Sequence, residues 1–108
     1  MADFSDFLMA LEDGTKDLAK KTLKGFKDEA LQDSKEFIRK TEEDLKRWMK
    51  LLASGELTQE DFEWLILGKK DLAELHALKE AGLALVRIDR FRNAFIDLII
   101  DTAFDMFL

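Results

Sequence analysis

Apolar residues recur every eleven positions through the first half of this chain. Three series run side by side over residues 23–52: Phe26, Phe37 and Trp48; Ala30, Thr41 and Leu52; and Leu23, Ser34 and Leu45. Eleven residues make three turns at about 3.67 residues per turn, so these positions line one nearly straight stripe on a helix. The pattern predicts a long helix over residues 16–53, with Thr15 as its N-cap.

Shorter patterns predict three more helices. Residues 2–12 place apolar side chains at intervals of three and four, and Gly14 interrupts that pattern. Gly55 suits the end of the long helix, and Thr58 with the acidic residues after it suits the start of a short helix over residues 59–67. A last long helix is predicted over residues 70–107. Nothing in the chain indicates a strand.

The predicted architecture is an all-α bundle of two long antiparallel helices plus two short ones, in one domain spanning residues 1–108. At 1.5 Å per residue the 16–53 helix would be roughly 57 Å long. A hairpin of two such helices would have a larger radius of gyration than the value of about 13 Å expected for a compact domain of this size. Either a second chain completes the bundle, or the 16–53 helix breaks near Asp33–Ser34 and folds back. The chain has no proline and no strong turn signal there, which favours dimerisation.

The last helix is apolar around most of its circumference, which indicates burial on several sides. We expect it to form the seam between chains in a coiled-coil-like dimer. The predicted interface residues are Phe91, Phe95, Leu98, Ile99, Thr102 and Met106.

A polar ridge follows the same helix at every fourth residue: Asp89, Asn93, Asp97, Asp101 and Asp105. Carboxylates strung along one helix do not converge on a point, as the oxygen ligands of Ca²⁺ must. We therefore interpret the ridge as solvated, or as an electrostatic partner of a basic helix. Antiparallel pairing of the long helices would set Asp97 opposite Lys27 and Asp101 opposite Lys24.

No arrangement of residues predicts catalysis or a bound metal or cofactor. His76 is the single histidine, and Ala73 stands where a Glu-x-x-His metal motif would need its glutamate. The serines lie in no nucleophile elbow, the glycines are scattered, and there is no cysteine. An enzyme is not expected.

The net charge is −6, and it is unevenly distributed. Residues 15–53 hold eleven Lys and Arg against eight Asp and Glu, whereas the flanking segments are acidic. An acidic chain with one mildly basic helix argues against nucleic-acid binding. The N-terminus has no positively charged region of a secretory signal, and charges interrupt every apolar stretch, so we expect a cytoplasmic protein.

Two short segments resemble known families. The segment TKDLAKKTLKGFKDEALQDSKE, residues 15–36, resembles the lysine-rich elevens of exchangeable apolipoproteins and late-embryogenesis-abundant proteins. The pattern departs from these families after this segment, where the apolar stripe carries the larger side chains Phe37, Trp48, Met49 and Leu52. The segment GELTQEDF resembles a bacterial interaction motif called the short C-terminal domain, of the form Gly-x-(Ile/Leu)-Thr-x-Glu-Glu-Phe. Neither resemblance by itself supports a function.

The functional hypothesis is a non-catalytic structural or protein-interaction module that self-associates as a homodimer. The alternative is a protein that binds a lipid or membrane surface through its basic, amphipathic 16–53 helix, against which the eight acidic residues of that segment count. A third possibility is an adaptor for an unidentified protein partner, with Phe91, Phe95 and Leu98 as anchors for a partner's helix.

Overall fold

An aspartate cap starts the first helix. The computed structural model describes residues 3–108, in which the Asp3 carboxylate accepts a hydrogen bond from the Asp6 backbone N–H at 3.0 Å. The Asp6 carboxylate accepts one in return from the Asp3 N–H at 3.1 Å. This capping box satisfies N–H groups that a helix start leaves free. Helix α1 then spans Phe4–Thr22, and the predicted start at residue 2 lies outside the described residues.

Helix α1 continues through Gly14 and Thr15, so the predicted break there is wrong. Gly14 lies against Leu98 of the last helix, where an added Cβ would stand 3.0 Å from the Leu98 Cδ1 atom. The buried Thr15 hydroxyl donates to the Leu11 carbonyl at 2.7 Å. Gly14 and Thr15 are therefore part of the helix where α1 packs closely against α5, and they do not form a turn.

The chain reverses direction at residues 23–26 instead. Gly25 has a φ of 87°, and the Phe26 N–H donates to the Leu23 carbonyl at 2.9 Å. Glycine adopts this left-handed conformation without steric cost. Helix α2 spans Lys27–Ala53, so the predicted helix over 16–53 is not continuous and its break lies at Gly25, not near Asp33–Ser34.

Asp33 and Ser34 stay helical because each has a hydrogen-bond partner. The Ser34 hydroxyl donates to the Ala30 carbonyl at 2.8 Å. The Asp33 carboxylate accepts hydrogen bonds from the backbone N–H groups of Ala77 and Leu78, at 2.9 and 3.0 Å. Asp33, which we considered as a place for a break in the helix, therefore joins α2 to a distant part of the chain.

That distant part is the short helix α4, His76–Glu80, which has no local side-chain cap. Its N-cap position is Leu75, held at a φ of 56°. Asp33 supplies the missing cap from α2, but it is itself buried. Burial raises the pKa of the Asp33 carboxyl, while the hydrogen bonds from Ala77 and Leu78 act in the opposite direction.

The predicted short helix over residues 59–67 is confirmed. Helix α3 spans Gln59–Leu67, and the Thr58 hydroxyl accepts a hydrogen bond from the Asp61 N–H at 3.0 Å. Gly55, with a φ of 81°, lies in the preceding turn. Here the local sequence signals agree with the structure.

The predicted helix over residues 70–107 is wrong as a single helix. The segment forms the 3-10 turn η1, Lys70–Leu72, then α4, and then α5, Leu85–Phe107. Gly82, with a φ of 86°, makes the turn between α4 and α5. The Arg92 Nε atom donates to the Ala73 carbonyl at 2.7 Å, which satisfies a backbone group that the interruption leaves free.

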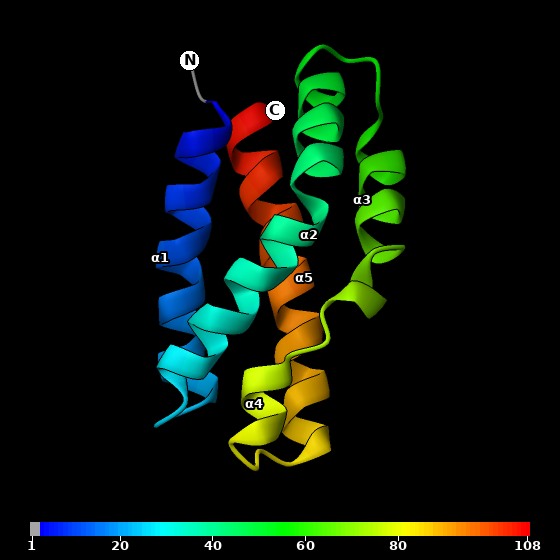
Figure 1. The fold of residues 1–108 in the computed structure, drawn as a ribbon. Helices are drawn as coiled ribbons and strands as arrows, with labels where there is room; N and C mark the ends of the chain where they lie inside the picture. The colour runs from blue at the N-terminus through cyan, green and yellow to red at the C-terminus, as the bar shows by residue number, and fades with distance from the viewer. Residues whose placement is uncertain (1–2) are drawn as a thin grey trace.

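Helices α1 and α5 run antiparallel, α2 crosses in front of them, and α3 covers the opposite edge (Figure 1). The Phe7 and Phe107 rings lie 6.5 Å apart at one end, and the Arg87 Nη2 atom donates to the Thr22 carbonyl at 3.1 Å at the other. The predicted all-α bundle is confirmed, with no strand among residues 3–108. The radius of gyration is 13.6 Å, as expected for a single chain of this length.

The eleven-residue stripe lies in the core of this bundle. Phe26 is half-buried, and the other eight positions of the three series are buried. The Phe37 ring meets the Phe95 ring edge-on, with centroids 5.7 Å apart. The stripe therefore predicted the packing face correctly, even though the helix that carries it begins at Lys27.

Replacing Gly25 by alanine should lower the free energy of unfolding by roughly 1–2 kcal/mol, because a side chain is strained at a positive φ. Urea denaturation measures this change. Gly68 is the matched control, since its φ of −65° suits any residue. Gly68→Ala should leave the stability unchanged or raise it by up to about 1 kcal/mol. Equal effects of the two substitutions would contradict the assigned turn.

Asp33→Ala should lower the free energy of unfolding by roughly 1–3 kcal/mol, because it leaves the N–H groups of Ala77 and Leu78 without their acceptor. Asp97 is exposed and accepts no hydrogen bond from another residue among those described, so Asp97→Ala should change stability by at most about 0.5 kcal/mol. If Asp33→Ala left the free energy of unfolding unchanged, α4 would not depend on this cap.

The raised pKa also has a consequence for pH dependence. The contribution of Asp33 to stability is fully present below its ordinary pKa of 3.8 and decreases as pH rises through the folded-state value. The stability of the parent relative to Asp33→Asn should therefore fall from acidic toward neutral pH. Urea titrations of both proteins across that range test the sign, and a difference that grows with pH would refute it.

Candidate functional site

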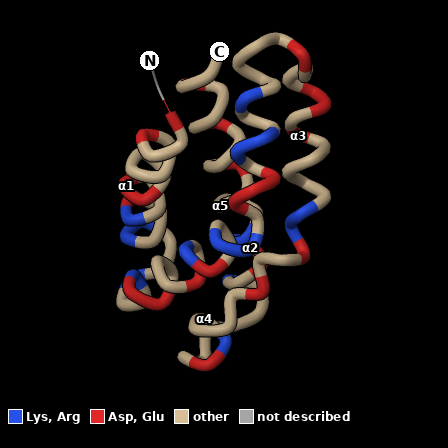
Figure 2. The backbone as a smooth tube through the Cα atoms, turned by 45° about the horizontal axis from the view of Figure 1, so that its top comes forward, with Lys and Arg blue, Asp and Glu red and all other residues tan. Residues whose placement is uncertain are grey.

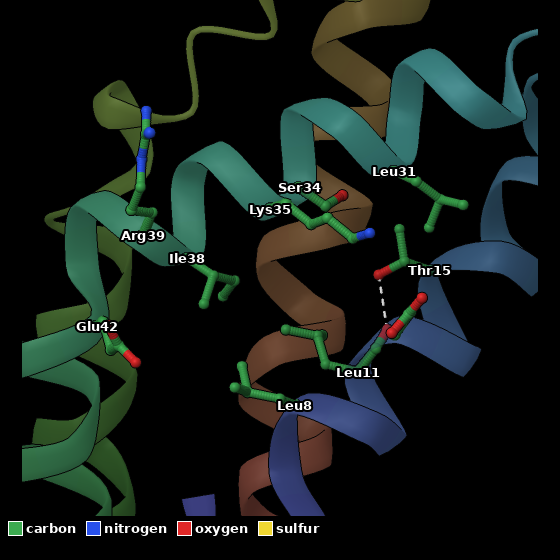
Figure 3. A pocket seen from close by; sticks show the side chains of 10 residues that line it. Leu8, Leu11, Thr15, Leu31, Ser34, Lys35, Ile38, Arg39 and Glu42 are labelled. Carbon is green, nitrogen blue, oxygen red and sulfur yellow. Dashed lines mark hydrogen bonds between the residues drawn. The ribbon is translucent and has the colours of Figure 1, made fainter. Parts of the chain in front are cut away.

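Helices α1 and α2 diverge from the reversal at residues 23–26 and leave a groove between them. The groove has a volume of about 310 Å³, and its apolar lining comes from Leu8, Leu11, Leu31 and Ile38. Figure 3 shows Leu8 and Leu11 on α1 facing Ile38 on α2. Three of these four side chains are only half-buried. The groove thus leaves apolar surface open to a further apolar group.

The two hydroxyl groups in the groove are already engaged. Thr15 donates to the Leu11 carbonyl at 2.7 Å, which Figure 3 marks, and Ser34 donates to the Ala30 carbonyl at 2.8 Å. A serine or threonine nucleophile needs an adjacent base that removes its proton. Here both protons point at backbone carbonyls, so the groove offers contact surface and no activated nucleophile.

Charged side chains from both helices line the rim of the groove. Glu12 and Glu42 each form an ion pair with a lysine one turn farther along the same helix, at 3.7 and 3.4 Å. Lys35 and Arg39 also line the groove, and within residues 3–108 neither has an ion-pair partner. The unpaired charge at the rim is therefore positive.

A second apolar surface lies on the outer side of α3. Phe62 and Ile66 of this helix are buried, and Trp64, on the opposite side, is 79% exposed. Leu67 lies one turn after Trp64 and is 45% exposed. Tryptophan is usually well buried, so a nearly free indole on a regular helix makes this face a candidate contact surface.

The charge beside Trp64 is negative. Glu60, Asp61 and Glu63 are exposed on the same short helix, and none of them forms an ion pair in the described part of the chain. Figure 2 shows acidic residues along the upper part of α3 and basic residues just beyond its lower end. The outer face of α3 thus combines an apolar centre with unpaired carboxylates.

The predicted interface residues of the last helix divide into two groups. Three are buried inside a single chain, because α1 and α3 cover α5 where we expected a second chain. The other three are half-buried, and their contact with another copy stays a prediction. The buried residues are Phe91, Phe95 and Ile99, and the half-buried ones are Leu98, Thr102 and Met106.

The expected pairing of the acidic ridge with the 16–53 helix is wrong. Asp97 and Asp101 are exposed, and no ion pair among residues 3–108 joins either to Lys27 or Lys24. The reason is the reversal at Gly25, which places α1 and not α2 along the length of α5. The ridge is solvated.

His76 belongs to a charged cluster that links α2 to the start of α4. Its Nε2 atom lies 2.7 Å from the Glu74 Oε2 atom, and the Lys40 Nζ atom lies 3.3 Å from Glu74 Oε1. The hydrogen bond from Lys40 is the main reason that the pKa of Glu74 is lowered. No group of three His, Cys, Asp or Glu side chains in the described residues could hold a metal ion.

Neither surface was identified from the sequence. The groove depends on the reversal at residues 23–26, because residues 8–15 and 31–42 face each other only after α1 folds back against α2. The sequence did contain evidence for the exposure of Trp64, because residues two positions apart on a helix point in nearly opposite directions. Its neighbours Phe62 and Ile66 could have been assigned to the core, leaving Trp64 outside.

Across residues 3–108, no helix combines the length and apolar character needed to cross a bilayer. Comparisons with protein-family models, curated proteins and solved structures find no match to this chain. Any functional proposal therefore depends on the α1–α2 groove, the outer face of α3 and the remaining exposed surface.

Proposed function

We propose that this protein is a non-catalytic helical module that self-associates head to tail. The outer face of α3 in one copy occupies the α1–α2 groove of the next copy. The observation that carries the proposal is Trp64, whose side chain is 79% exposed on a well-formed helix of a chain that also has an open apolar groove. The proposal keeps self-association but assigns it to surfaces other than the last helix.

The apolar parts of the two surfaces complement each other. An aromatic side chain buries about 150–250 Å² when it is enclosed, and it dominates the energy of many interfaces. The groove, with Leu8, Leu31 and Ile38 half-buried on its walls, offers an apolar site for the Trp64 indole, and Leu67 can follow it. Enclosing these groups removes apolar surface from water on both copies.

The charges complement each other as well. Lys35 and Arg39 line the groove, and neither has an ion-pair partner in the described residues. Glu60 and Glu63, which lie beside Trp64 on α3, also have no ion-pair partner there. The acidic residues that line the groove already have lysine partners. Opposite charges around an apolar centre orient two partners and speed their encounter.

The two surfaces lie on opposite edges of the bundle, with α1 at one edge and α3 at the other (Figure 1). One copy therefore contributes a different surface to each of its two neighbours, which makes the contact heterologous. Such contacts form rings where the geometry closes and open chains where it does not. A symmetric pairing of two Trp64 faces would instead bring acidic residues together.

The size of the interface sets the expected affinity. Helix α3 has nine residues, and its outward face is a small contact surface. Interfaces below about 1,200 Å² of total buried area are mostly transient. We therefore expect weak, concentration-dependent self-association in the micromolar range or weaker, and not an obligate dimer.

The alternative of lipid binding through the 16–53 helix is less favoured. Phe37 and Trp48, which would insert into a lipid surface, are 2% and 7% exposed within the bundle. Helix α2 would have to leave the core before its apolar stripe could meet lipid. That step exposes the largest side chains of the interior.

Two variants test head-to-tail association, because one alters the outer face of α3 and the other alters the α1–α2 groove. Trp64→Ser removes the inserting group, and the double variant Lys35→Glu, Arg39→Glu reverses the charge of the groove. Each should be monomeric by sedimentation velocity at concentrations where the parent associates. A mixture of the two should form one-to-one dimers and nothing larger, because only one intact pair of surfaces remains.

Met9→Ser is the matched control, since Met9 is 68% exposed and lies outside both surfaces. This variant should associate like the parent. The proposal would be refuted if the parent chain stayed monomeric up to millimolar concentration. A mixture that stays monomeric would refute it as well, because a symmetric contact predicts no rescue.

A further inference from the structure

The end of the bundle opposite the chain termini carries an exposed apolar turn. Figure 1 shows the turn between α4 and α5 at this end, beside the turn between α1 and α2. Leu85 and Val86, in the first turn of α5, are 69% and 62% exposed. Ala81 and Ala84, which precede them, are exposed as well. Neither of the two surfaces assigned to self-association includes these residues.

Basic residues outnumber acidic ones around this turn, where Glu80 and Asp89 are the exposed acidic residues on α4 and the start of α5. Residues 18–27 contain four lysines and no acidic residue, in a chain whose net charge is −6. Arg87 follows Val86 directly on α5, and Arg90 lies about one turn later. The Arg87 Nη2 atom donates to the Thr22 carbonyl at 3.1 Å, which brings the first turn of α5 against the lysine-rich end of α1. We call this group the basic end: Lys20, Lys21, Lys24, Lys27, Arg87 and Arg90.

The positive charge of the basic end is not neutralised within the chain. All six of its side chains are exposed, and none of them forms an ion pair among residues 3–108. The basic residues of the middle of the molecule behave differently, since Lys16, Lys40 and Lys46 each pair with a glutamate. A cluster of six unpaired cations on an acidic protein attracts anions.

We infer that the basic end docks on an anionic phospholipid surface, with Leu85 and Val86 inserted at the level of the headgroups. Membrane-surface binding combines apolar side chains that enter the interface with Lys and Arg that contact anionic headgroups. Both parts occur here within one turn of α5 and the adjoining end of α1. The docking surface is this turn, and the buried stripe of α2 takes no part in it.

The apolar part of the surface distinguishes a membrane from other anionic partners. Single-stranded nucleic acids bind through aromatic side chains on which their bases stack. The aromatic residues of this end are Phe26, which is half-buried, and Phe91, which is 1% exposed, whereas the exposed apolar groups Leu85 and Val86 are aliphatic. Aliphatic side chains gain little from a nucleic-acid backbone or an acidic peptide, but they gain from the acyl boundary of a bilayer.

Docking at this end would hold α5 with its N-terminus at the membrane and keep the acidic residues of the second half of α5, and those of α3, away from it. Asp97, Asp101 and Asp105 lie progressively farther along α5 from the basic end. Glu60 and Glu63 belong to α3, outside this turn. The α3 face and the groove would remain free, so a docked copy could still bind its neighbours.

Vesicle co-sedimentation of the full chain tests the inference. The parent should bind vesicles of equimolar phosphatidylserine and phosphatidylcholine, should not bind phosphatidylcholine alone, and should lose affinity as salt concentration rises. Lys24→Glu with Arg90→Glu should weaken binding at least about fivefold for each reversed charge. Leu85→Ser with Val86→Ser should also weaken it severalfold. All four side chains are exposed, so the variants should keep the parent's circular dichroism spectrum.

Matched controls lie at the other end of the bundle. Lys50→Glu reverses one exposed lysine there, and Leu108→Ser removes an apolar side chain that is 60% exposed. Both should bind the anionic vesicles far more tightly than the variants of the basic end. The inference is overturned if the parent does not bind anionic vesicles, or if the controls weaken binding as much. It is also overturned if Leu85→Ser with Val86→Ser binds like the parent, which would indicate a general site for polyanions.

Discussion

The reversal of the chain at Gly25 is the constraint on which the rest of the structure depends. A positive φ at one glycine turns what would be one helix into α1 and α2 and lays α1 along α5. The apolar surface of α5 is thereby covered within one chain, and Phe91 and Phe95 become core residues. The same reversal opens the groove between α1 and α2. Without it, the last helix would need a second chain.

Long-range hydrogen bonds hold the second half of the chain in place. Asp33 caps α4 from α2, and Arg92 on α5 satisfies the Ala73 carbonyl, so the first interruption of the predicted last helix, before α4, has partners elsewhere in the fold. Interrupting a helix is costly when the freed backbone groups have no partner. These contacts stabilise the bend at Leu75, whereas the bend at Gly82 is a local turn with a positive φ and a hydrogen bond from the Gly82 N–H to the Lys79 carbonyl.

The surfaces left over by this core carry the proposed functions. The bundle buries its stripe of aromatics, yet it leaves Trp64, Leu85 and Val86 outside, each beside unpaired charge. Acidic residues lie beside Trp64, and basic residues lie near Leu85 and Val86. The α3 face therefore suits a positively charged partner, and the basic end suits a negatively charged one. Weak head-to-tail contacts and a membrane-facing end would reinforce each other, since a membrane raises the effective concentration of bound copies.

The helical class, the helix over residues 59–67 and the buried stripe were predictable from sequence, because periodicity and capping are local properties of the chain. The positions at which the long helices break depend on contacts between distant residues. Gly14 and Gly25 look alike as sequence signals, but Leu98 packs on the first and the chain turns at the second. The Asp33 cap, the groove and the six-cation end likewise join residues far apart in the chain. No local pattern could reveal them, because their partners meet only after the helices pack.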